Sequence, residues 1–430
     1  MYLNPLITLR HYKDIFFAVD YNNQELWQLD KMSYDLLKLF ESSSADGGMK
    51  IVYGQYSKKD YDEFIDFCCQ KSILLKSFQD LEPFLGKRRR ITLKLSKKID
   101  EFSLNNIFPA SAEIVLTTQC NLRCIHCSVT QGNQNKHCIY LNENSCKRAL
   151  DELKDLGCIM VTFTGGEPLL HKDFIEILRY ANKLKFNIMI LSNLTLINPL
   201  FFETLHECTG VSDIQVSIYS DNEDVNNKIL GRNVSISKLK DIILTLKKMH
   251  VRVRLACVVM DENCSDFYTV KHLAKELNVL YGFWFHVYAT MAHDNCTTVH
   301  QLNKCELQRI FSEYRDIEDL NGNQRADDLL CSGFSNRLAI NAAGDVYPCI
   351  LFPYTLGNIH KDLLQDLWNI SDFACKLRKM KMRDMESCSD CKYKKRCKNC
   401  VGINFIENGD FLKPSSSRCT ITELQYEKRN

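Results

Sequence analysis

Six β-rich segments alternate with amphipathic helical patterns between residues 111 and about 290, and this alternation restricts the fold more than any other feature. The pattern at 143–157, for example, has its apolar residues on one helical face and ends at Gly157. Strands separated by helices form parallel sheets with right-handed crossovers. The sequence therefore predicts an α/β fold in which ligands bind at the carboxyl ends of the strands. The six segments are EIVLTT, MVTFTG, NIMILSN, DIQVSIY, VRLACVV and FWFHVYA.

Three cysteines, Cys120, Cys124 and Cys127, follow the first of these segments with C-x3-C-x2-C spacing. Three thiols leave one position of a metal centre open, and open positions are where metal chemistry occurs. On one loop they can cap three irons of a [4Fe–4S] cluster, so that the fourth iron awaits a small chelating ligand. The second segment ends in TGGEP, where two glycines allow close backbone approach and Glu167 can pair with an ammonium group. This arrangement predicts an amino-acid-like cofactor; a zinc site with a distant fourth ligand is the alternative.

The motifs CNLRCIHC and GGEP, each after a strand of a βα barrel, resemble the radical S-adenosylmethionine (SAM) superfamily. The resemblance implies a partial (β/α)6 barrel and a [4Fe–4S] cluster that binds SAM. SAM is cleaved reductively, and the resulting 5′-deoxyadenosyl radical removes a hydrogen atom from the substrate. No catalytic residue beyond the cluster is implied, and His126 is expected to pack against the cluster. By matching position, Gly165, Gly166 and Glu167 hold the SAM amino group, Ser192, Asn193 and Ser217 contact its ribose or carboxylate, and Arg232 pairs with its carboxylate. For Asn193 and Ser217, ordinary hydrogen bonding at a strand end is the alternative.

Seven cysteines near the C-terminus resemble the SPASM extension of radical SAM enzymes, which holds two auxiliary [4Fe–4S] clusters. The chain departs from the SPASM pattern in one gap, because two residues separate Cys397 from Cys400 where three are usual. A zinc ribbon is the alternative, since C-x2-C pairs also suit tetrahedral zinc. Cys375 is expected in a helix and in the core. The resemblance assigns Cys331, Cys349 and Cys400 to auxiliary cluster I, whose fourth ligand is open, and Cys388, Cys391, Cys397 and Cys419 to auxiliary cluster II, for three [4Fe–4S] clusters in all.

Residues 1–86 read as a small α+β unit. Two short strands are predicted around a turn at Asn22 and Asn23, a helix follows in KMSYDLLKLF, and SSSADGG is predicted to be a loop. A second helix is predicted after an N-cap at Ser57. This pattern is similar to the winged-helix-like PqqD-type domain, which binds a leader peptide by adding it as a strand to its sheet edge. A structural cap on the barrel is the alternative.

Composition limits the class of protein. The chain has 430 residues, a net charge of +2 and 45% hydrophobic residues, so neither nucleic acid nor a membrane is an expected partner. It also has 21 cysteines. Without a secretion signal these indicate metal or catalytic thiols in a cytoplasmic protein. The expected division is a PqqD-like domain at 1–86, a basic linker with a solvated face at 87–110, the radical SAM core at 111–320 and the SPASM region at 321–430. A docking surface for an acidic partner is the alternative for the linker.

This domain order resembles the maturases of ribosomally made peptides. The resemblance implies a precursor peptide with a leader as substrate, and an electron donor such as flavodoxin or ferredoxin. Thioether formation, another crosslink and epimerisation remain open; Cys264, Cys296 or Cys305 could return a hydrogen atom in the last case. Sulfatase maturation is disfavoured, because Ile350 stands where those relatives have an acid. The alternatives are a radical SAM/SPASM dehydrogenase or protein maturase with another substrate, and a non-catalytic zinc-binding protein.

Overall fold

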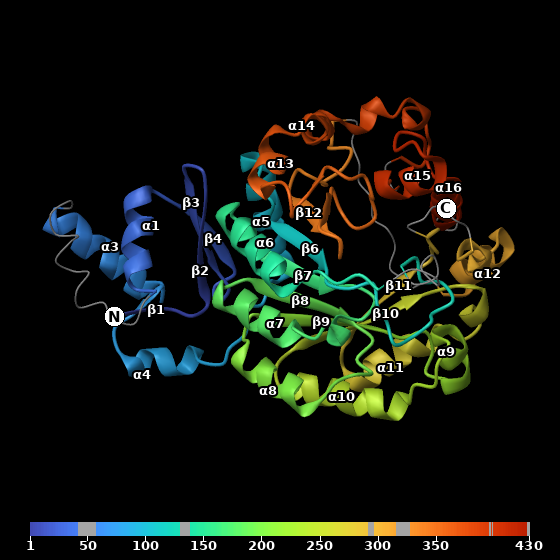
Figure 1. Ribbon diagram of the computed structural model, residues 1–430, viewed down its shortest axis with the longest axis horizontal. Coiled ribbons are helices and arrows are strands. Elements are labelled where there is room, and N and C mark those ends of the chain that lie inside the picture. The colour runs from blue at the N-terminus through green and yellow to red at the C-terminus, as the bar shows by residue number, and fades with distance from the viewer. Residues whose placement is uncertain are drawn as a thin grey trace.

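A computed structural model describes residues 1–41, 57–129, 138–290, 296–314, 327–394, 397 and 399–427 (Figure 1). The predicted SSSADGG loop lies outside these residues. A sheet of nine strands forms the centre, with the order β11-β10-β9-β8-β7-β6-β12-β13-β14. Six of its parallel strands confirm the predicted βα barrel core. They are β6 (Ser111–Val115), β7 (Met160–Thr164), β8 (Asn187–Ser192), β9 (Val211–Ser217), β10 (Arg252–Val258) and β11 (Leu280–Trp284).

Helices connect the parallel strands, and Figure 1 shows several of them along one side of the sheet. Four were predicted from their apolar periodicity and are present, whereas α8 and α9 were not predicted. Side-chain caps fix the beginnings of several helices: Asn142 accepts from the N–H of Ser145, and Ser235 accepts from that of Lys238. The helices of this layer are α6 (Glu143–Asp155), α7 (Phe174–Lys183), α8 (Pro199–Glu207), α9 (Glu223–Leu230), α10 (Ile236–Lys248) and α11 (Thr269–Leu277).

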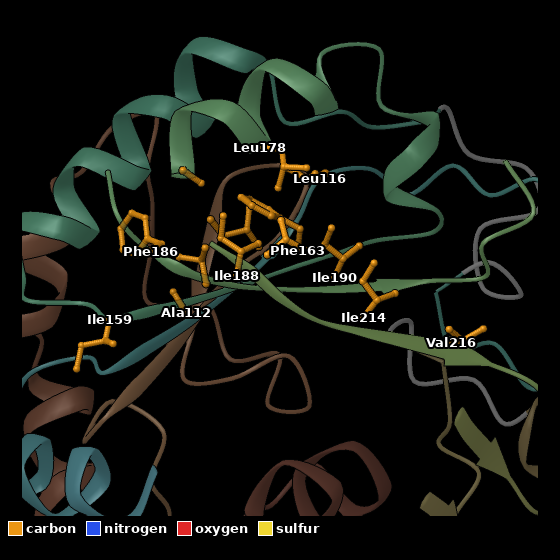
Figure 2. Close-up of a cluster of buried hydrophobic side chains, with 14 of the residues drawn as sticks. Ala112, Leu116, Ile159, Phe163, Leu178, Phe186, Ile188, Ile190, Ile214 and Val216 are labelled. Atoms are coloured by element: carbon orange, nitrogen blue, oxygen red, sulfur yellow. The ribbon is translucent and has the colours of Figure 1, made fainter. Parts of the chain in front are cut away.

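The face of the sheet that lies under these helices is apolar and closed to solvent. Figure 2 shows Phe163 of β7, Ile188 of β8 and Ile214 of β9 close to Leu178 of α7, and all four are fully buried. Burying a side chain of this size stabilises the fold by about 1.5–3 kcal/mol. Because side chains alternate along a strand, the residues between these point to the opposite face, inside the partial barrel.

The opposite face of the sheet lines an interior cavity of about 710 Å³. The first residues of the parallel strands contribute to it, among them Met160, Asn187 and Asp213, so it opens toward the amino ends of the strands. The cysteine loop lies at the other end, after the carboxyl end of β6. The mid-strand residues in the cavity wall are Glu113, Thr162, Gln215 and Arg254, together with Met189.

The described part of the N-terminal unit contains an antiparallel sheet with the order β2-β3-β4, three α-helices and a short pair formed by β1 and β5. The two predicted strands around Asn22 and Asn23 are β3 and β4, and Ser57 caps α3 as predicted. Strand β2 was not predicted. The match to a PqqD-type domain stays a prediction. The bounds are β1 (Tyr2–Leu3), β2 (Ile7–Tyr12), β3 (Ile15–Asp20), β4 (Glu25–Leu29), α1 (Lys31–Leu39), α3 (Lys58–Gln70), β5 (Leu74–Leu75) and α4 (Phe78–Leu81).

The basic segment at 87–110 packs tightly against the barrel, so the expectation of a solvated face is wrong for Arg88 and Arg89. Arg88 donates hydrogen bonds to four backbone carbonyls, including those of Leu205 and Met249. Arg89 is only 5% exposed. The segment also contains helix α5 (Leu93–Asn106), which was not predicted. These guanidinium groups tie the segment to the loops that precede the barrel strands.

The N-terminal unit is joined to the barrel by apolar and polar contacts. Tyr12, Phe17 and Val19 belong to the same buried cluster as the barrel core. The buried Arg10 guanidinium donates to the carbonyls of Cys158, at 2.7 Å, and Leu184, at 2.9 Å. The unit therefore rests on the barrel, and the domain boundaries at residues 86 and 110 stay predictions.

The C-terminal region continues the central sheet. Strand β12 (Arg337–Ile340) pairs in parallel with β6, and β13 (Asp345–Tyr347) and β14 (Gly357–Asn358) extend the edge. A hairpin turn at Gly344 joins β12 to β13, and this glycine has a φ of +86° that favours glycine. Among the described residues, no helix is long and apolar enough to cross a membrane. The helices of this region are α12 (Lys304–Glu313), α13 (Leu364–Ile370), α14 (Asp372–Lys379), α15 (Val401–Asn408) and α16 (Ser416–Glu427).

Candidate metal centres and cofactor site

The first cysteine trio lies on the loop that follows β6, and its three thiols are close together. Burial is the main cause that raises the pKa of Cys120 to about 11, and the neighbouring Glu167 and Cys127 contribute to this rise. Burial raises the pKa of Cys124 as well, with added contributions from Cys127 and Cys120. The Sγ of Cys120 accepts from the N–H of Leu122 at 3.4 Å. Three half-buried thiols on one loop are a donor set that a cationic cluster would stabilise, so the trio fits a [4Fe–4S] cluster.

His126 packs within this loop against Tyr219, and its predicted contact with a cluster stays a prediction. The two ring centroids are 4.9 Å apart with an edge-on geometry, and the Tyr219 hydroxyl lies 3.2 Å from Nε2 of His126. Burial lowers the pKa of His126 to about 4, so its ring is neutral at pH 7. A neutral, buried ring in this position keeps water from one side of the cysteine loop.

The two glycines of GGEP bring the loop after β7 against the backbone of the cysteine loop. Gly166 N–H donates to the carbonyl of Thr117 at 2.7 Å, and Glu167 N–H donates to that of Gln119 at 2.8 Å. A Cβ on Gly165 would lie 2.5 Å from the Thr117 carbonyl oxygen, and one on Gly166 would lie 2.1 Å from that of Gln119. These glycines are therefore required by the packing of two loops. Their predicted contact with the SAM amino group stays a prediction.

The Glu167 carboxylate is fully buried between the ends of β7 and β8. Its Oε1 accepts from the Ser192 hydroxyl at 2.7 Å and from the Leu169 N–H at 3.1 Å, and its Oε2 accepts from the Asn193 N–H at 2.8 Å. Burial raises the pKa of Glu167 despite these donors. A carboxylate offers about four acceptor positions, so one remains for a further donor such as an ammonium group.

The other predicted cofactor residues differ in their distance from the cysteine loop. Asn193 reaches it directly, because its side-chain amide donates to Asn121 Oδ1 at 3.0 Å and lies 3.9 Å from Cys120 Sγ. Ser217 ends β9 and hydrogen-bonds with Tyr219. Arg232 is exposed and lines a separate cleft of about 930 Å³ together with Asn121. Ser192 and Asn193 thus adjoin Glu167 and the trio, whereas Arg232 lies at the periphery.

Four of the C-terminal cysteines surround one small cavity of about 50 Å³, and they are the four that were assigned to auxiliary cluster II. Burial is the main cause that raises the pKa of Cys388 to about 11, and three neighbouring thiols, those of Cys397, Cys419 and Cys391, contribute to this rise. The Thr422 hydroxyl lies 3.8 Å from Cys397 Sγ. The cavity has the donor set of a four-cysteine cluster, and zinc ligation would use the same residues. The four residues are Cys388, Cys391, Cys397 and Cys419.

The other three assigned cysteines form a second group. Burial raises the pKa of Cys331 to about 11, and Cys400 contributes to the rise. Burial also raises the pKa of Cys349, and both Cys331 and Cys400 add to this effect. Cys375, in contrast, is in α14 and contacts the carbonyl of Asn369 at 3.7 Å. The short gap before Cys400 therefore does not separate it from its predicted partners. The assignment of these ligands stays a prediction.

Two residues inside the barrel were not found by sequence reasoning. Glu113 of β6 accepts from the N–H of Ile350 at 3.3 Å, so a carboxylate does lie beside the residue that follows Cys349. Arg254 of β10 faces the same interior cavity. The alternation of side chains along EIVLTT and VRLACVV is the signal that could have placed both residues inside the barrel.

Comparison with known proteins identifies two regions of the chain. The radical SAM superfamily model matches residues 114–274. This part of the chain is a radical SAM domain. An iron–sulfur cluster-binding (SPASM) domain model matches residues 331–392, so Cys397, Cys400 and Cys419 lie beyond the matched range. These domains imply [4Fe–4S] clusters and SAM as cofactors, and they make the chain an enzyme.

Two curated relatives are similar to this chain. One is an AdoMet-dependent heme synthase of Methanosarcina barkeri, 24% identical over 69% of this chain and 93% of its own length. The other is the antilisterial bacteriocin subtilosin biosynthesis protein AlbA of Bacillus subtilis, 26% identical over 61% of this chain and 60% of its own length. Among solved structures, Streptococcus suis SuiB bound to precursor peptide SuiA is similar with a TM-score of 0.63 and 17% identity. That similarity covers 97% of this chain and 99% of SuiB, and it establishes a shared fold.

Proposed function

We propose that this radical SAM protein is a maturase that modifies a ribosomally made precursor peptide. The observation that supports this most is the extent of the similarity to SuiB, which spans the N-terminal unit, the barrel and the cysteine-rich region. The SuiB structure contains the precursor peptide SuiA, and AlbA is a bacteriocin biosynthesis protein. A chain with the same three parts in the same order is suited to the same class of substrate.

The cysteine groups would hold the metal centres. Cys120, Cys124 and Cys127 would bind the SAM cluster, with Glu167 positioned for the cofactor's ammonium group. When bound, cluster and SAM supply the radical that removes a hydrogen atom from the peptide. The two C-terminal groups would bind auxiliary clusters. The buried loop around His126 and Tyr219 would keep water away from the radical, because a radical exposed to solvent is lost to side reactions.

The interior cavity would receive the peptide segment that is modified. Its volume of about 710 Å³ lies within the range of sites that bind small ligands or a few residues. Glu113 places this cavity next to Ile350 and so next to the group that contains Cys349. A residue in the cavity would thus lie beside auxiliary cluster I, while the SAM cluster lies toward the other end of the barrel.

The N-terminal unit would recognise the leader. Its three-stranded sheet has two edge strands, β2 and β4, and an added peptide strand would bind through its backbone. The buried contacts of Arg10 hold this unit on the barrel, so a bound leader would direct the rest of the peptide toward the same side of the protein. An electron donor such as flavodoxin or ferredoxin would supply the reducing electron, and the 21 free thiols suit a cytoplasmic protein.

The choice among the possible reactions is narrowed only in part. Cys264, Cys296 and Cys305, the candidate hydrogen donors for epimerisation, are not among the residues that line the interior cavity. Crosslinking therefore agrees better with the cavity than epimerisation does. The carboxylate of Glu113 occupies the space beside Ile350, so the lack of an acid at position 350 is weaker evidence against sulfatase-type chemistry than the sequence alone indicates.

The test uses the full chain, reconstituted without oxygen, with SAM, a reductant and a candidate precursor peptide that carries a leader. We expect 5′-deoxyadenosine and a change in peptide mass, and no modification by the Cys124→Ala variant. The leader hypothesis is checked by removing the leader from the peptide, which should lower the rate strongly. Equal rates with and without the leader would argue against leader recognition.

A second candidate, a radical SAM enzyme that acts on a small molecule, is favoured by the similarity to heme synthases over most of their length. Formation of 5′-deoxyadenosine with an unmodified peptide would support it. Metal analysis would test the zinc-binding alternative: three [4Fe–4S] clusters require about twelve irons per chain, whereas a zinc protein would contain little iron.

A further inference from the structure

The interior cavity contains one arginine whose charge no described residue neutralises. Arg254 is in the middle of β10, paired in the ladder with Gln215 of β9 and Leu280 of β11. Its neighbours on the strand, Val253 and Leu255, are buried under the helices, so Arg254 points into the barrel. Among the described residues its side chain has neither a hydrogen-bond acceptor nor an ion-pair partner.

The other charged groups of the cavity are partnered. Arg252, two residues earlier on β10, forms an ion pair with Asp213 and donates to the carbonyl of Ile91. Asp100 accepts from Asn336 at 3.0 Å, and Glu113 accepts from the Ile350 N–H. Arg337 lies near both of these acids, since its charge lowers the pKa of each against the dominant effect of burial.

The cavity is therefore polarised across its width. The wall formed by β6, β12 and α5 has two acids and one arginine, Arg337, whereas the wall formed by β10 and β11 presents the unpaired Arg254. Trp284 lies over Gly282 of β11, because a Cβ on Gly282 would be 2.8 Å from the indole ring. Gly282 thus allows the aromatic ring to cover this part of the strand.

We propose that Arg254 binds a carboxylate of the substrate, and that this contact selects an acidic residue near the modified position. This inference rests on the proposed peptide maturase function. While the cavity is filled with water, an exposed guanidinium is hydrated at little cost. When a peptide displaces that water, the guanidinium needs a new acceptor, and a carboxylate matches its planar pair of donors.

The position of Arg254 fixes where the acidic residue must lie. Arg254 is two residues before Ala256, which pairs with Ser217 at the cofactor end of the barrel. Two residues of a strand span roughly 7 Å, so the carboxylate belongs within about two or three residues of the reacting position in an extended peptide. Because the opposite wall of the cavity contains two acids, a basic group in the same peptide would favour that wall, near Glu113.

The test is a selection of random dodecapeptides by mRNA display on the immobilised, anaerobically reconstituted full chain with SAM. We expect Asp and Glu to be enriched about tenfold or more over Asn and Gln at one or two adjacent positions, as a charge-assisted contact predicts. Arg254→Gln should abolish this preference, Arg254→Lys should keep part of it, and Arg254→Glu should change it to Lys and Arg. Arg179→Gln, on the outer surface of α7, is the matched control and should select as the unmodified chain does.

The outcomes separate the two proposals. Peptides that are retained without acidic enrichment, or with an enrichment that survives Arg254→Gln, would overturn the assignment of Arg254 and leave the maturase function standing. Retention of no peptide at all would contradict both. Iron content and SAM binding of each variant, which should equal those of the unmodified chain, show that the variants are folded and loaded.

Discussion

The Oε2 atom of Glu167 accepts a hydrogen bond of 2.8 Å from the backbone N–H of Asn193, and this contact joins the carboxyl ends of two neighbouring barrel strands. The same asparagine reaches the cysteine loop through its side chain. Glu167 is therefore both a candidate for binding the cofactor and a support for the loop that holds the cluster.

Glu167→Gln is expected to weaken SAM binding and to lower stability. An amide group has one acceptor oxygen and one donor nitrogen, so a donor would face either the Asn193 N–H or the donors on Oε1. An unsatisfied buried contact of this kind costs about 1–3 kcal/mol. Equilibrium dialysis with labelled SAM and thermal unfolding measure the two effects. Iron content should be almost unchanged, and loss of iron in parallel with SAM would show that Glu167 mainly supports the cysteine loop.

Cys124→Ala is expected to abolish reductive cleavage of SAM while the auxiliary clusters remain. About eight of about twelve irons should stay bound, because the two C-terminal cysteine groups are formed by other residues. Iron analysis and the yield of 5′-deoxyadenosine check this expectation. The buried Cys146→Ala variant in α6 is the control and should keep full iron content. Continued cleavage in Cys124→Ala would contradict the cluster assignment.

The sequence predicted the barrel because its signal is local and repeated. Each strand segment is apolar and each helix has its own periodicity, so β6 to β10 and four helices could be located from short windows. The cysteine groups were also predictable, since fixed spacing on one loop places thiols together. Strand β11 begins at Leu280 and ends at Trp284, whereas the predicted segment FWFHVYA starts later and extends past the strand. The apolar residues continue beyond the strand, so they did not mark its bounds.

The features that could not be predicted from the sequence depend on contacts between distant segments. The partners of Arg88 and Arg89 are backbone carbonyls more than 90 residues away, and a run of basic residues does not reveal them. In the same way, Glu113 and Ile350 meet only because β12 pairs beside β6. Arg254 looks like any strand residue until its neighbours are known, since the absence of a partner is a property of the folded chain.

Cys391→Ala is expected to remove one auxiliary cluster and to loosen the C-terminal region locally. The cavity formed by the four cysteines has no other described thiol in its wall, so the cluster cannot be completed. About four irons should be lost, and hydrogen exchange should increase around α16, which contains Cys419. The helical Cys375→Ala variant serves as the control. Full iron content in Cys391→Ala would argue against this residue as a ligand.

Arg89→Met is expected to destabilise the barrel by about 2–4 kcal/mol. The buried guanidinium donates to Asn182 Oδ1 at 2.8 Å and to the Phe186 carbonyl, and both acceptors would remain buried without it. Gly210→Ala should act in the same direction, since its Cβ would lie 2.4 Å from Nη2 of Arg89. Arg90→Met is the matched control, because Arg90 is exposed and the hydrogen bond that its side chain donates to the His250 carbonyl is at the surface. Urea denaturation followed by circular dichroism measures all three variants. A transition midpoint of Arg89→Met equal to that of Arg90→Met would show that the basic segment is a linker and not a structural part of the barrel.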